Sequence, residues 1–526
     1  MKRHELIVIG AGPAGLSAAI EAAKAGMDVI VFDENARPGG QLFKQIHKFF
    51  GSKQHHAKER GFRIGEDLLK EAEAAGVTVQ LNATVMGIYE NKEVTVKHGS
   101  EVDHYKADKI ILATGAAENM IPFKGWDTPG VIGAGAAQAL MNLQGVQPGQ
   151  KVLMVGSGNV GLVVSFQLLQ AGCQVVAVID AAPRVGGYGV HAAKVARTGV
   201  PFYMSHTVVE AKGGDYVTSA VIAQVDDHFQ PIPGTEKELE VDTICIAVGL
   251  SPMSQLASNA TCDMALLPKK GGHVALLNEF GETSVPGIYC AGDVAGIEEA
   301  SSAMIQGRAV ADHVCLVSGY LSQEEFQSRY TACQAALGQL RQGMFAPENK
   351  GRTDLTHTDE GYPLSLSLLQ KGFVSDEEIK AFPAAYYQAA GVHPVIECTQ
   401  NIPCDPCQDA CKKGCIQVGA NIVKLPVIDP ERQCTGCGMC VANCSGQAIF
   451  LVNEDFAPGY ASIGLPYEFL PLPQAGDKGT ALGRDGQPVC EAEVISVRSA
   501  PVMDKTNILT MKVPVEYVHQ ARFFQA

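Results

Sequence analysis

The sequence predicts an α/β fold with two nested Rossmann-like domains, followed by a C-terminal α+β module and a small β element. Two stretches, near residues 5–33 and 151–180, each read as strand, glycine turn, helix and strand. Nine of the 16 cysteines lie between Cys398 and Cys444, and alternating apolar patterns follow near the C-terminus. A chain of 526 residues exceeds one ordinary hydrophobic core, so several domains are expected.

The first of these stretches predicts a dinucleotide site. Leu6–Ile9 is a continuous apolar run, which is typical of a strand covered by helices on both faces. The turn Gly10-Ala11-Gly12-Pro13-Ala14-Gly15 follows, and a helix and second strand lead to Asp33. Such glycines permit a tight turn, close approach of a pyrophosphate and close helix packing, while the helix N-terminus attracts phosphate. We expect Asp33 to take the ribose hydroxyls; the alternative is a glycine turn that binds nothing.

Three later segments extend this pattern. Arg37-Pro38-Gly39-Gly40-Gln41-Leu42 follows the acidic strand end, one later strand ends in Thr114-Gly115, and another ends in Gly292-Asp293. In this order the segments resemble the flavoproteins with two dinucleotide-binding domains, which include thioredoxin reductase, lipoamide dehydrogenase and the flavoprotein subunits of opine and proline dehydrogenases. The resemblance implies bound FAD, with Asp293 on its ribityl or phosphate part and a helix starting near Glu299 pointing at the flavin. The expected FAD residues are Gly10, Gly12, Ala14, Gly15, Asp33, Glu34, Gly39, Gly40, Gln41, Thr114, Gly115, Gly292 and Asp293.

The second stretch repeats the pattern with Gly156-Ser157-Gly158-Asn159-Val160-Gly161 and ends at Asp180. In the family this domain holds NAD(P)H, and an acidic strand end favours NAD over NADP. The span from Gly156 to Asp180 is one residue longer than that from Gly10 to Asp33, so Asp180 can miss the ribose. NAD(H) and a bound adenine nucleotide such as ATP or ADP therefore both stay open. The candidate residues are Gly156, Gly158, Asn159, Gly161 and Asp180.

The chain has no cysteine pair where disulfide reductases of this architecture carry one. The corresponding stretches, 39–50 and 130–142, contain no cysteine, which argues against thioredoxin-reductase-type chemistry. Residues 130–138 and 186–191 instead resemble the opine oxidase and proline or hydroxyproline dehydrogenase branch. His191 and His206 are assigned no role.

The cysteine run from Cys434 to Cys444 has the spacing C-x2-C-x2-C-x3-C. Thiolates at this spacing hold a [4Fe–4S] cubane, and small glycines between them let backbone amides reach its sulfides. Zinc is the main alternative, but structural zinc sites use two separated cysteine pairs. We therefore predict an iron–sulfur cluster.

A second run lies upstream, and in two-cluster ferredoxins the fourth cysteine of each run ligates the other cluster. One predicted cluster then uses Cys398, Cys404, Cys407 and Cys444, and the other uses Cys411, Cys434, Cys437 and Cys440. The proline that usually follows the fourth cysteine is Lys412 in one run and Ser445 in the other. Cys415 can replace Cys411 or Cys398, so the ligands of the first cluster stay open.

Charge and composition restrict the partners and the compartment. A net charge of −15 argues against nucleic acid or an anionic membrane as partner. Residues 152–179 carry no charge, but their glycines and glutamines favour a buried strand, helix and strand over a membrane span. Bunched cysteines without a preceding signal peptide indicate a reducing, cytoplasmic location.

These features predict six segments. They are a first FAD-binding part (1–125), an NAD(P) or adenine-nucleotide-type domain (126–252), a second FAD-binding part (253–320), a helical linker (321–395), a two-[4Fe–4S] ferredoxin-like module (396–456) and a C-terminal β extension (457–526) with strands near 494–497 and 508–511.

The family resemblance favours a FAD- and iron–sulfur-dependent oxidoreductase. We expect the electron-transferring subunit of a hetero-oligomeric amino- or imino-acid dehydrogenase of the proline, hydroxyproline, sarcosine or opine type. A second flavoprotein subunit would oxidise the amine, with a small iron–sulfur subunit or ferredoxin as a further partner. The alternatives are a self-sufficient NAD(P)H:acceptor oxidoreductase and a non-catalytic electron-transfer scaffold that holds ATP or ADP.

Overall fold

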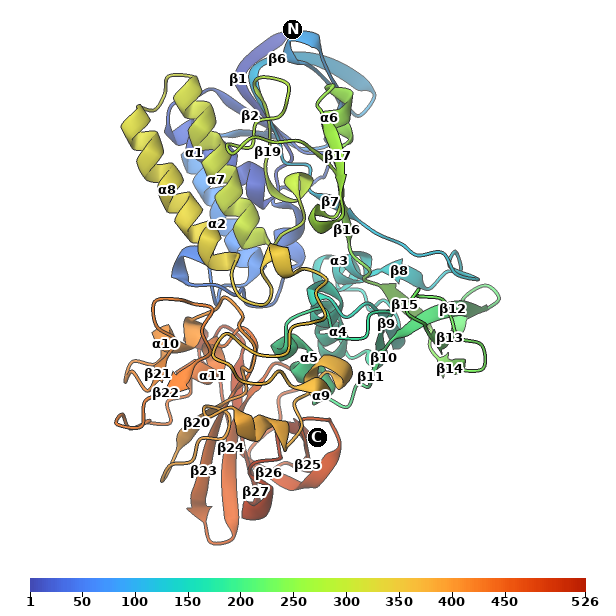
Figure 1. The fold of residues 1–526 in the computed structure, drawn as a ribbon, viewed down its shortest axis with the longest axis vertical. Helices are drawn as coiled ribbons and strands as arrows, with labels where there is room; N and C mark the ends of the chain where they lie inside the picture. The colour runs from blue at the N-terminus through green and yellow to red at the C-terminus, as the bar shows by residue number, and fades with distance from the viewer. The chain divides into compact units, whose positions relative to one another are not determined.

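The computed structural model describes residues 1–526, which divide into two compact units (Figure 1). Unit 1 comprises residues 1–49, 54–118 and 249–342, and unit 2 comprises residues 50–53, 119–248 and 343–526. Each unit therefore contains one of the two glycine turns, and the second turn is inserted between two parts of the first unit, as a nested arrangement requires.

A seven-stranded sheet forms the centre of unit 1. Its order is β3-β2-β1-β6-β5-β4, and β19 pairs with β6. β1, β2, β3, β6 and β19 run parallel, whereas β4 and β5 form an antiparallel extension of β6. The bounds are β1 Lys2–Ile9, β2 Val29–Phe32, β3 Thr78–Gln80, β4 Ala83–Tyr89, β5 Glu93–His98, β6 Glu101–Leu112 and β19 Ile288–Cys290.

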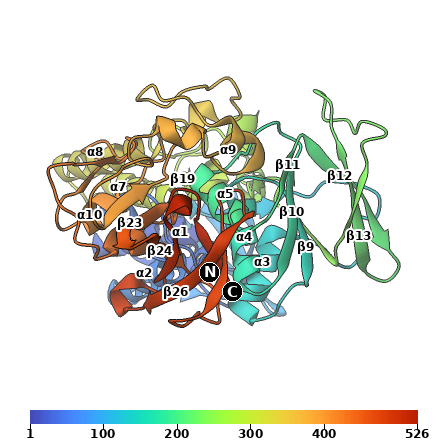
Figure 2. The ribbon, with the colours of Figure 1, turned by 90° about the horizontal axis from the view of Figure 1, so that it is seen from below.

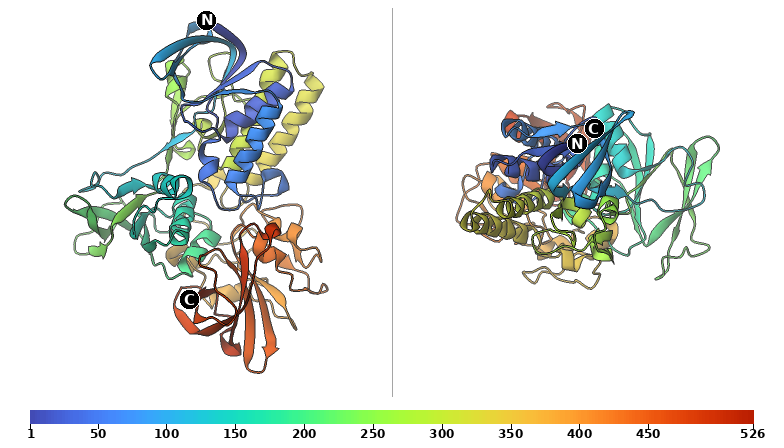
Figure 3. Two further views of the ribbon diagram at one scale, coloured as in Figure 1. Left: turned by 180° about the vertical axis from the view of Figure 1, so that it is seen from behind. Right: turned by 90° about the horizontal axis from the view of Figure 1, so that it is seen from above.

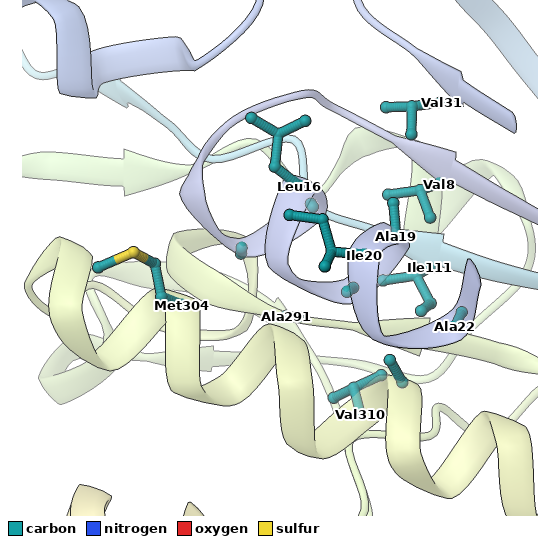
Figure 4. Close-up of a cluster of buried hydrophobic side chains, with 14 of the residues drawn as sticks. Val8, Leu16, Ala19, Ile20, Ala22, Val31, Ile111, Ala291, Met304 and Val310 are labelled. Atoms are coloured by element: carbon teal, nitrogen blue, oxygen red, sulfur yellow. The ribbon is translucent and has the colours of Figure 1, made fainter. Parts of the chain in front are cut away.

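Four helices accompany this sheet: α1 Pro13–Lys24, α2 Gly61–Ala74, α7 Ala300–Val317 and α8 Gln323–Leu340, which Figure 3 shows together in blue and yellow. α1 packs between the sheet and α7, with side chains such as Val8, Leu16, Ile20 and Met304 in one core (Figure 4). Smaller elements complete the unit: β7 Ala116–Glu118, β16 Leu250–Pro252, α6 Gln255–Asn259, β17 Met264–Leu267 and β18 Gly272–Ala275.

The helices α1 and α7 touch along their backbones. A Cβ atom on Gly307 of α7 would stand 2.1 Å from the carbonyl oxygen of Ala14, a distance that no side chain tolerates. The absence of a side chain at Gly307 therefore fixes how closely α7 approaches the first glycine turn.

Unit 2 begins with a parallel sheet of order β11-β10-β9-β15-β8. A separate antiparallel sheet of β12, β13 and β14 lies beside it (Figure 2). The bounds are β8 Val131–Gly133, α3 Ala134–Gln144, β9 Lys151–Val155, α4 Asn159–Gln170, β10 Gln174–Asp180, α5 Gly189–Ala196, β11 Phe202–Met204, β12 His206–Gly213, β13 Val217–Gln224, β14 Lys237–Glu240 and β15 Thr243–Ile246. Both predicted strand–turn–helix–strand units are thus present.

The cysteine-rich segment has the order strand, helix, hairpin, helix, strand. It comprises β20 His393–Ile396, α10 Pro406–Ala410, β21 Ile416–Gln417, β22 Val427–Ile428, α11 Met439–Asn443 and β23 Ile449–Ala457, with β20 paired antiparallel to β23 and α10 against α11. A sheet of order β20-β23-β24-β27-β26-β25-β28 continues from it. The remaining strands are β24 Tyr460–Tyr467, β25 Lys478–Leu482, β26 Pro488–Arg498, β27 Asn507–Pro514 and β28 Phe523–Gln525.

Two predicted boundaries differ from the structure. The boundary between 456 and 457 falls inside β23, because β23 and β24 form a hairpin within one continuous sheet. The expected helical linker 321–395 is divided: α8 packs on α7 in unit 1, whereas residues 343–395 belong to unit 2 and contain one short helix, α9 Leu366–Lys371. The start of α8 is fixed by a capping box between Ser322 and Glu325.

The uncharged stretch 152–179 forms β9, α4 and β10, a buried strand–helix–strand unit. None of the helices in the structure combines the length and the apolar character that crossing a bilayer requires.

A buried carboxyl group on α7 makes the stability of unit 1 depend on pH. The Asp312 side chain is 4% exposed, and burial, followed by the nearby Glu21, raises its pKa from 3.8 to about 6, although Arg329 lies 3.4 Å away. The folded state therefore holds this proton more tightly than the unfolded state, so wild-type stability falls as pH rises from about 4 to about 6. We expect Asp312→Asn to be more stable than wild type at pH 7.5, by about 2 kcal/mol, and the difference to disappear near pH 4.

Urea denaturation followed at both pH values measures this difference. Asp67→Asn, on the exposed face of α2, is the matched control, and its stability should stay within about 0.5 kcal/mol of wild type. A difference for Asp312→Asn that is the same at both pH values would contradict the assignment.

Candidate functional site

The first glycine turn leaves an open concave backbone at the start of α1. Gly10 has φ +105°, and a Cβ there would meet the Ala113 carbonyl oxygen at 2.3 Å; at Gly15 it would meet the Gly10 oxygen at 1.9 Å. A Cβ on Gly12, in contrast, meets no atom within 4 Å. No side chain caps α1, so its first amides remain available for an anionic ligand. Gly10 and Gly15 thus hold the turn closed, and Gly12 faces the space for the ligand.

The carboxylate of Asp33 points back into this turn. One oxygen accepts a hydrogen bond from the Ala11 amide at 2.7 Å, and the other accepts two from Asn35 at 2.8 Å each. Asp33 is 6% exposed, whereas the next residue, Glu34, is exposed at the end of β2. Asp33 therefore stiffens the loop, and Glu34 is the carboxylate that projects into solvent beside it.

The second glycine pair closes over the first turn. The Gly39 amide donates to the Ala11 oxygen at 2.7 Å, and a Cβ on Gly40 would stand 2.9 Å from the Gly12 Cα. Gln41 is exposed next to them. The residues Gly39, Gly40 and Gln41 are thus brought to the same side of the turn as Gly12.

The remaining predicted residues of unit 1 follow β6 and β19, which pair with each other beside β1. Thr114 donates its hydroxyl hydrogen to the Met253 oxygen at 2.7 Å, and Gly115 has φ +73° with open space at its Cβ position. Gly292, with φ +76°, lies so close to Ala14 that a Cβ would stand 2.8 Å from the Ala14 Cβ. The Asp293 carboxylate accepts from the Glu298 amide at 3.3 Å, in the turn that leads into α7.

The second glycine turn in unit 2 repeats this backbone geometry. Gly156 has φ +112°, with the Ala247 oxygen 2.2 Å from its Cβ position, and the Gly161 Cβ position lies 2.1 Å from the Gly156 oxygen. Gly158 again has open space on its free side, and no side chain caps α4. The turn therefore keeps the form of a nucleotide-binding turn.

Asp180 has the same role as Asp33, although the sequence spacing differs by one residue. One of its oxygens accepts from the Ser157 amide and hydroxyl at 2.7 Å each, and the other accepts from the Ala182 amide at 2.9 Å. The residue after Asp180 is Ala181, where the first domain has Glu34. The end of β10 therefore lacks a projecting carboxylate.

The Asn159 side chain is also used within the protein. Its oxygen accepts a hydrogen bond from the Tyr188 amide at 2.8 Å, and the Gly187 amide donates to the Ser157 oxygen at 2.9 Å. The segment 186–188 thus packs on the second turn as Gly39 and Gly40 pack on the first.

The first group of cysteines, Cys398, Cys404, Cys407 and Cys444, is half-buried in unit 2. Burial is the largest effect on these thiols, and it raises the pKa of Cys398 to about 12. A charge on Cys444 further raises the pKa of the other three, so the four sulfurs are close neighbours. Aromatic side chains shield the group: Phe50, Tyr188 and Phe345 pack around Cys398, Cys404 and Cys444. Such thiols stay protonated at neutral pH unless a bound cation stabilises the thiolates.

The second group lies nearer the surface. Burial, followed by charges on Cys434, Cys437 and Cys411, raises the pKa of Cys440. Because charges act strongly only at short range, these four thiols lie close together and form the second group. Cys437 is the one exposed cysteine of the chain. Cys415 is buried beside them, and its amide donates to the Cys411 sulfur at 3.2 Å. Each group thus contains the last cysteine of the other run.

Backbone amides prepare individual sulfurs for negative charge. The Gly436 amide points at the Cys434 sulfur and the Ala448 amide at the Cys444 sulfur, at 3.4 Å each. Such N–H···S contacts are the usual support of a metal-bound thiolate. No cluster of three or more His, Cys, Asp or Glu side chains is arranged tightly enough to hold one metal ion.

A buried ion network adjoins the first group and is not visible in the sequence. Glu397, next to Cys398, accepts from Arg484 Nη2 and Arg522 Nε at 2.6 Å each. Arg197, 6% exposed at the end of α5, donates to the Gln447 oxygen at 3.0 Å. Burial raises the pKa of the Cys444 thiol, and hydrogen bonds from the Ala448, Gly446 and Gln447 amides, followed by the charge of Arg197, partly oppose that rise. These arginines stand alone in the sequence, so no motif could have predicted them.

The two open glycines provide a matched test of nucleotide binding. Alanine at Gly12 or Gly158 meets no protein atom and suits their negative φ angles, so both variants should fold normally. We expect Gly12→Ala to weaken dinucleotide binding in unit 1 by about tenfold or more, because the methyl group occupies the ligand space. Gly158→Ala should leave that binding unchanged, and fluorescence titration with FAD measures both.

Gly15→Ala serves as the structural control. Its methyl group would collide with the Gly10 oxygen, so this variant should lose thermal stability rather than ligand affinity alone. Equal FAD affinity in Gly12→Ala and wild type would show that the first turn does not face the ligand.

The chain resembles components of known oxidases and synthases. The matching subunit of opine oxidase from Agrobacterium tumefaciens is 29% identical over 377 residues, 64% of this chain and 70% of the relative. The HcnB subunit of hydrogen cyanide synthase from Pseudomonas aeruginosa is 28% identical over 59% of this chain and 70% of its own length. The alpha subunit of sarcosine oxidase from Rhizobium meliloti is 30% identical over 59% of this chain and 30% of that subunit.

Solved structures show the same fold. L-proline dehydrogenase from P. horikoshii superposes with a TM-score of 0.50 at 21% identity, over 64% of this chain and 59% of its own. Thioredoxin reductase from T. acidophilum gives 0.51 at 22% identity, over 60% of this chain and 99% of its own. The family model described as pyridine nucleotide-disulphide oxidoreductase matches residues 4–307. Because this match spans more than half of the chain, the chain belongs to the pyridine nucleotide-disulphide oxidoreductase family and is an oxidoreductase.

Proposed function

We propose that the chain is the FAD- and iron–sulfur-dependent electron-transferring subunit of a multi-subunit amino- or imino-acid dehydrogenase. The observation that carries this proposal is the pairing, in one chain, of an open dinucleotide turn with two groups of four cysteines. The flavin would exchange two electrons with a donor and pass them singly to iron–sulfur clusters.

The residues of unit 1 fit FAD. Gly12 and the uncapped first turn of α1 offer space and amides to a pyrophosphate, and Glu34, exposed beside Asp33, is suited to ribose hydroxyls. Gly115, Gly292 and Asp293 follow the neighbouring strands β6 and β19, where the ribityl chain would lie. In this assignment Asp33 keeps the turn in shape and does not contact the ribose.

The two cysteine groups fit two [4Fe–4S] clusters better than zinc. A cubane is wider than a single ion, so its four thiolates stand further apart than the ligands of one metal. We assign Cys398, Cys404, Cys407 and Cys444 to one cluster and Cys411, Cys434, Cys437 and Cys440 to the other. Cys415 then orients Cys411 through its amide and is not a ligand.

The surroundings of the first group suit a low-polarity cluster site. Phe50, Tyr188 and Phe345 keep water away from the sulfurs, and Arg197 places a buried positive charge near Cys444. That charge would partly offset the negative charge of the four thiolates and the cluster, which burial otherwise penalises.

The known relatives support the division of labour. The relatives from opine oxidase, hydrogen cyanide synthase and sarcosine oxidase are each named as one subunit of a larger protein. In the present chain the stretches 39–50 and 130–142, where disulfide reductases carry a redox cysteine pair, contain no cysteine. A flavin bound here therefore has no dithiol at those positions to exchange electrons with. A second flavoprotein subunit that oxidises the amine, and a ferredoxin or small iron–sulfur subunit, are the proposed partners in the cytoplasm.

One set of cysteine variants tests the ligand assignment. After anaerobic reconstitution, wild type should contain about eight iron atoms and show two interacting cluster signals in electron paramagnetic resonance spectra of the reduced protein. Cys404→Ser should retain about four iron atoms and the signal of one cluster. Cys415→Ser is the matched control and should retain both clusters; loss of a cluster in this variant would make Cys415 a ligand.

A self-sufficient NAD(P)H:acceptor oxidoreductase is the second candidate function, and the open space at Gly158 favours it. Against it stand the engaged carboxylate of Asp180 and the missing acid at Ala181, which leave the nicotinamide nucleotide without a ribose contact. The remaining alternative is a non-catalytic electron-transfer scaffold that retains ATP or ADP. Such a nucleotide would bind the same turn, but no hydride would be transferred.

Anaerobic mixing separates these functions. With the purified chain, FAD and clusters intact, we expect neither NADH nor proline or sarcosine to bleach the flavin rapidly, because hydride entry depends on a partner subunit. Stopped-flow absorbance measures the flavin and the clusters together. Rapid bleaching by NADH would establish the reductase instead, and rapid bleaching by an amine would remove the need for a second subunit.

A further inference from the structure

The surface around Cys437 combines three features that no other cysteine of the chain shares. Cys437 is exposed, whereas each other cysteine is buried or half-buried. The segment around it, residues 433–453, contains no charged side chain, although the whole protein carries a net charge of −15, and the cations near Cys437 come from other segments. Two apolar side chains, Val392 (37% exposed) and Val502 (65% exposed), flank the same segment.

The contacts place these features together. The Gly436 Cβ position lies 3.2 Å from Val392, and Val502 belongs to the 3-10 turn Pro501–Met503, which packs on α11 immediately after Cys437. Arg498 of β26 donates to the carbonyl oxygens of Cys437 and Gly436, at 3.2 and 3.4 Å. Its guanidinium group is therefore fixed against the backbone of Gly436 and Cys437.

Further cations lie next to cysteines of the second group along the chain. Lys412 and Lys413 are exposed and follow Cys411 directly, and Arg432 bridges to them by donating to the Lys413 oxygen at 3.3 Å. The carboxylates nearby are Asp429, which pairs with Arg432 at 3.2 Å, the exposed Glu431 and Asp409, and Asp455, which accepts from the Gly391 amide next to Val392 at 3.4 Å.

We propose that this surface, the Cys437 patch (Val392, Lys412, Lys413, Arg432, Cys437, Arg498 and Val502), is the docking site for an acidic one-electron carrier protein. The proposal rests on the proposed function, because it needs a cluster on Cys411, Cys434, Cys437 and Cys440. One electron passes from that cluster to the oxidised carrier; no bond forms and no proton moves. Electron transfer weakens steeply with distance, so the exposed cysteine is where a carrier comes nearest.

The cations of the Cys437 patch determine which sign of charge a carrier needs and how it is oriented when it docks. An acidic protein is repelled by the net charge of this chain and attracted by the cations of the Cys437 patch, so docking at the patch is favoured over docking at acidic parts of the surface. The exposed valines supply a small apolar centre, which the surrounding cations encircle, as in protein interfaces generally. A basic carrier would meet the opposite preference and bind elsewhere on the surface.

The test measures binding of a plant-type ferredoxin, an acidic probe, to the reconstituted chain by biolayer interferometry at 0.15 M salt. At this ionic strength distant charges are screened beyond about 8 Å, so local charges decide the affinity. The double variant Lys412→Glu, Lys413→Glu should weaken ferredoxin binding by about tenfold or more. The matched control is Lys424→Glu. Lys424 is exposed and lies outside the patch, on the loop whose Ile422 oxygen accepts from the Cys404 amide, so this variant should bind ferredoxin as wild type does.

Cytochrome c, a basic carrier, provides the reciprocal probe and should bind the double variant more tightly than wild type. Ferredoxin that does not bind, or that binds the double variant as well as wild type, overturns the proposal. Electron paramagnetic resonance spectra of the same samples separate the two levels. If no cluster signal appears, the proposed function fails; if both clusters are present but binding is insensitive to the patch charges, only the docking site fails.

Discussion

The cysteine-rich half of unit 2 depends on the hydrogen-bonded ion pairs that the buried Glu397 carboxylate forms with two arginines. Glu397 directly precedes Cys398 and accepts hydrogen bonds from Arg484 and Arg522, which lie near β25 and β28 of the C-terminal sheet. Removing one partner of such a network usually costs about 3–5 kcal/mol, because charge is left buried without compensation. Glu397 therefore holds the first cysteine in place against the sheet that the C-terminal residues build, and the β extension is part of the cysteine module.

The two glycine turns share one backbone design. In both, an aspartate at the strand end accepts a hydrogen bond from the turn, Asp33 from Ala11 and Asp180 from Ser157. The difference lies one residue later, where Glu34 projects and Ala181 cannot. The turn geometry thus depends on the aspartate, while the choice of nucleotide is left to the following residue and its neighbours.

Burial separates the roles of the two cysteine groups. The first packs against Phe50, Tyr188 and Phe345 and lies near the buried charge of Arg197, and each of its four cysteines is half-buried. The second reaches the surface at Cys437, with Arg498 fixed beside it. The two groups therefore differ in how far their cysteines reach the surface.

The sequence by itself determined the elements with strong local patterns. Two glycine turns between apolar strands and the C-x2-C spacing each fix backbone geometry within a few residues, so their positions were predictable. The crossed grouping of the eight cysteines was expected from the pattern of two-cluster ferredoxins, and their role as cluster ligands stays a prediction.

Only the tertiary structure decided which side chains face these elements. The orientation of Asp33 and Asp180, the engagement of Asn159 and the convergence of Arg197, Arg484 and Arg522 depend on residues far apart in the sequence. The single sheet across residues 456–457 likewise required β23 to pair with both β20 and β24. Hydrogen bonds and buried ion pairs form between the groups that folding brings together. Because those partners are far apart in the sequence, a local sequence pattern cannot predict them.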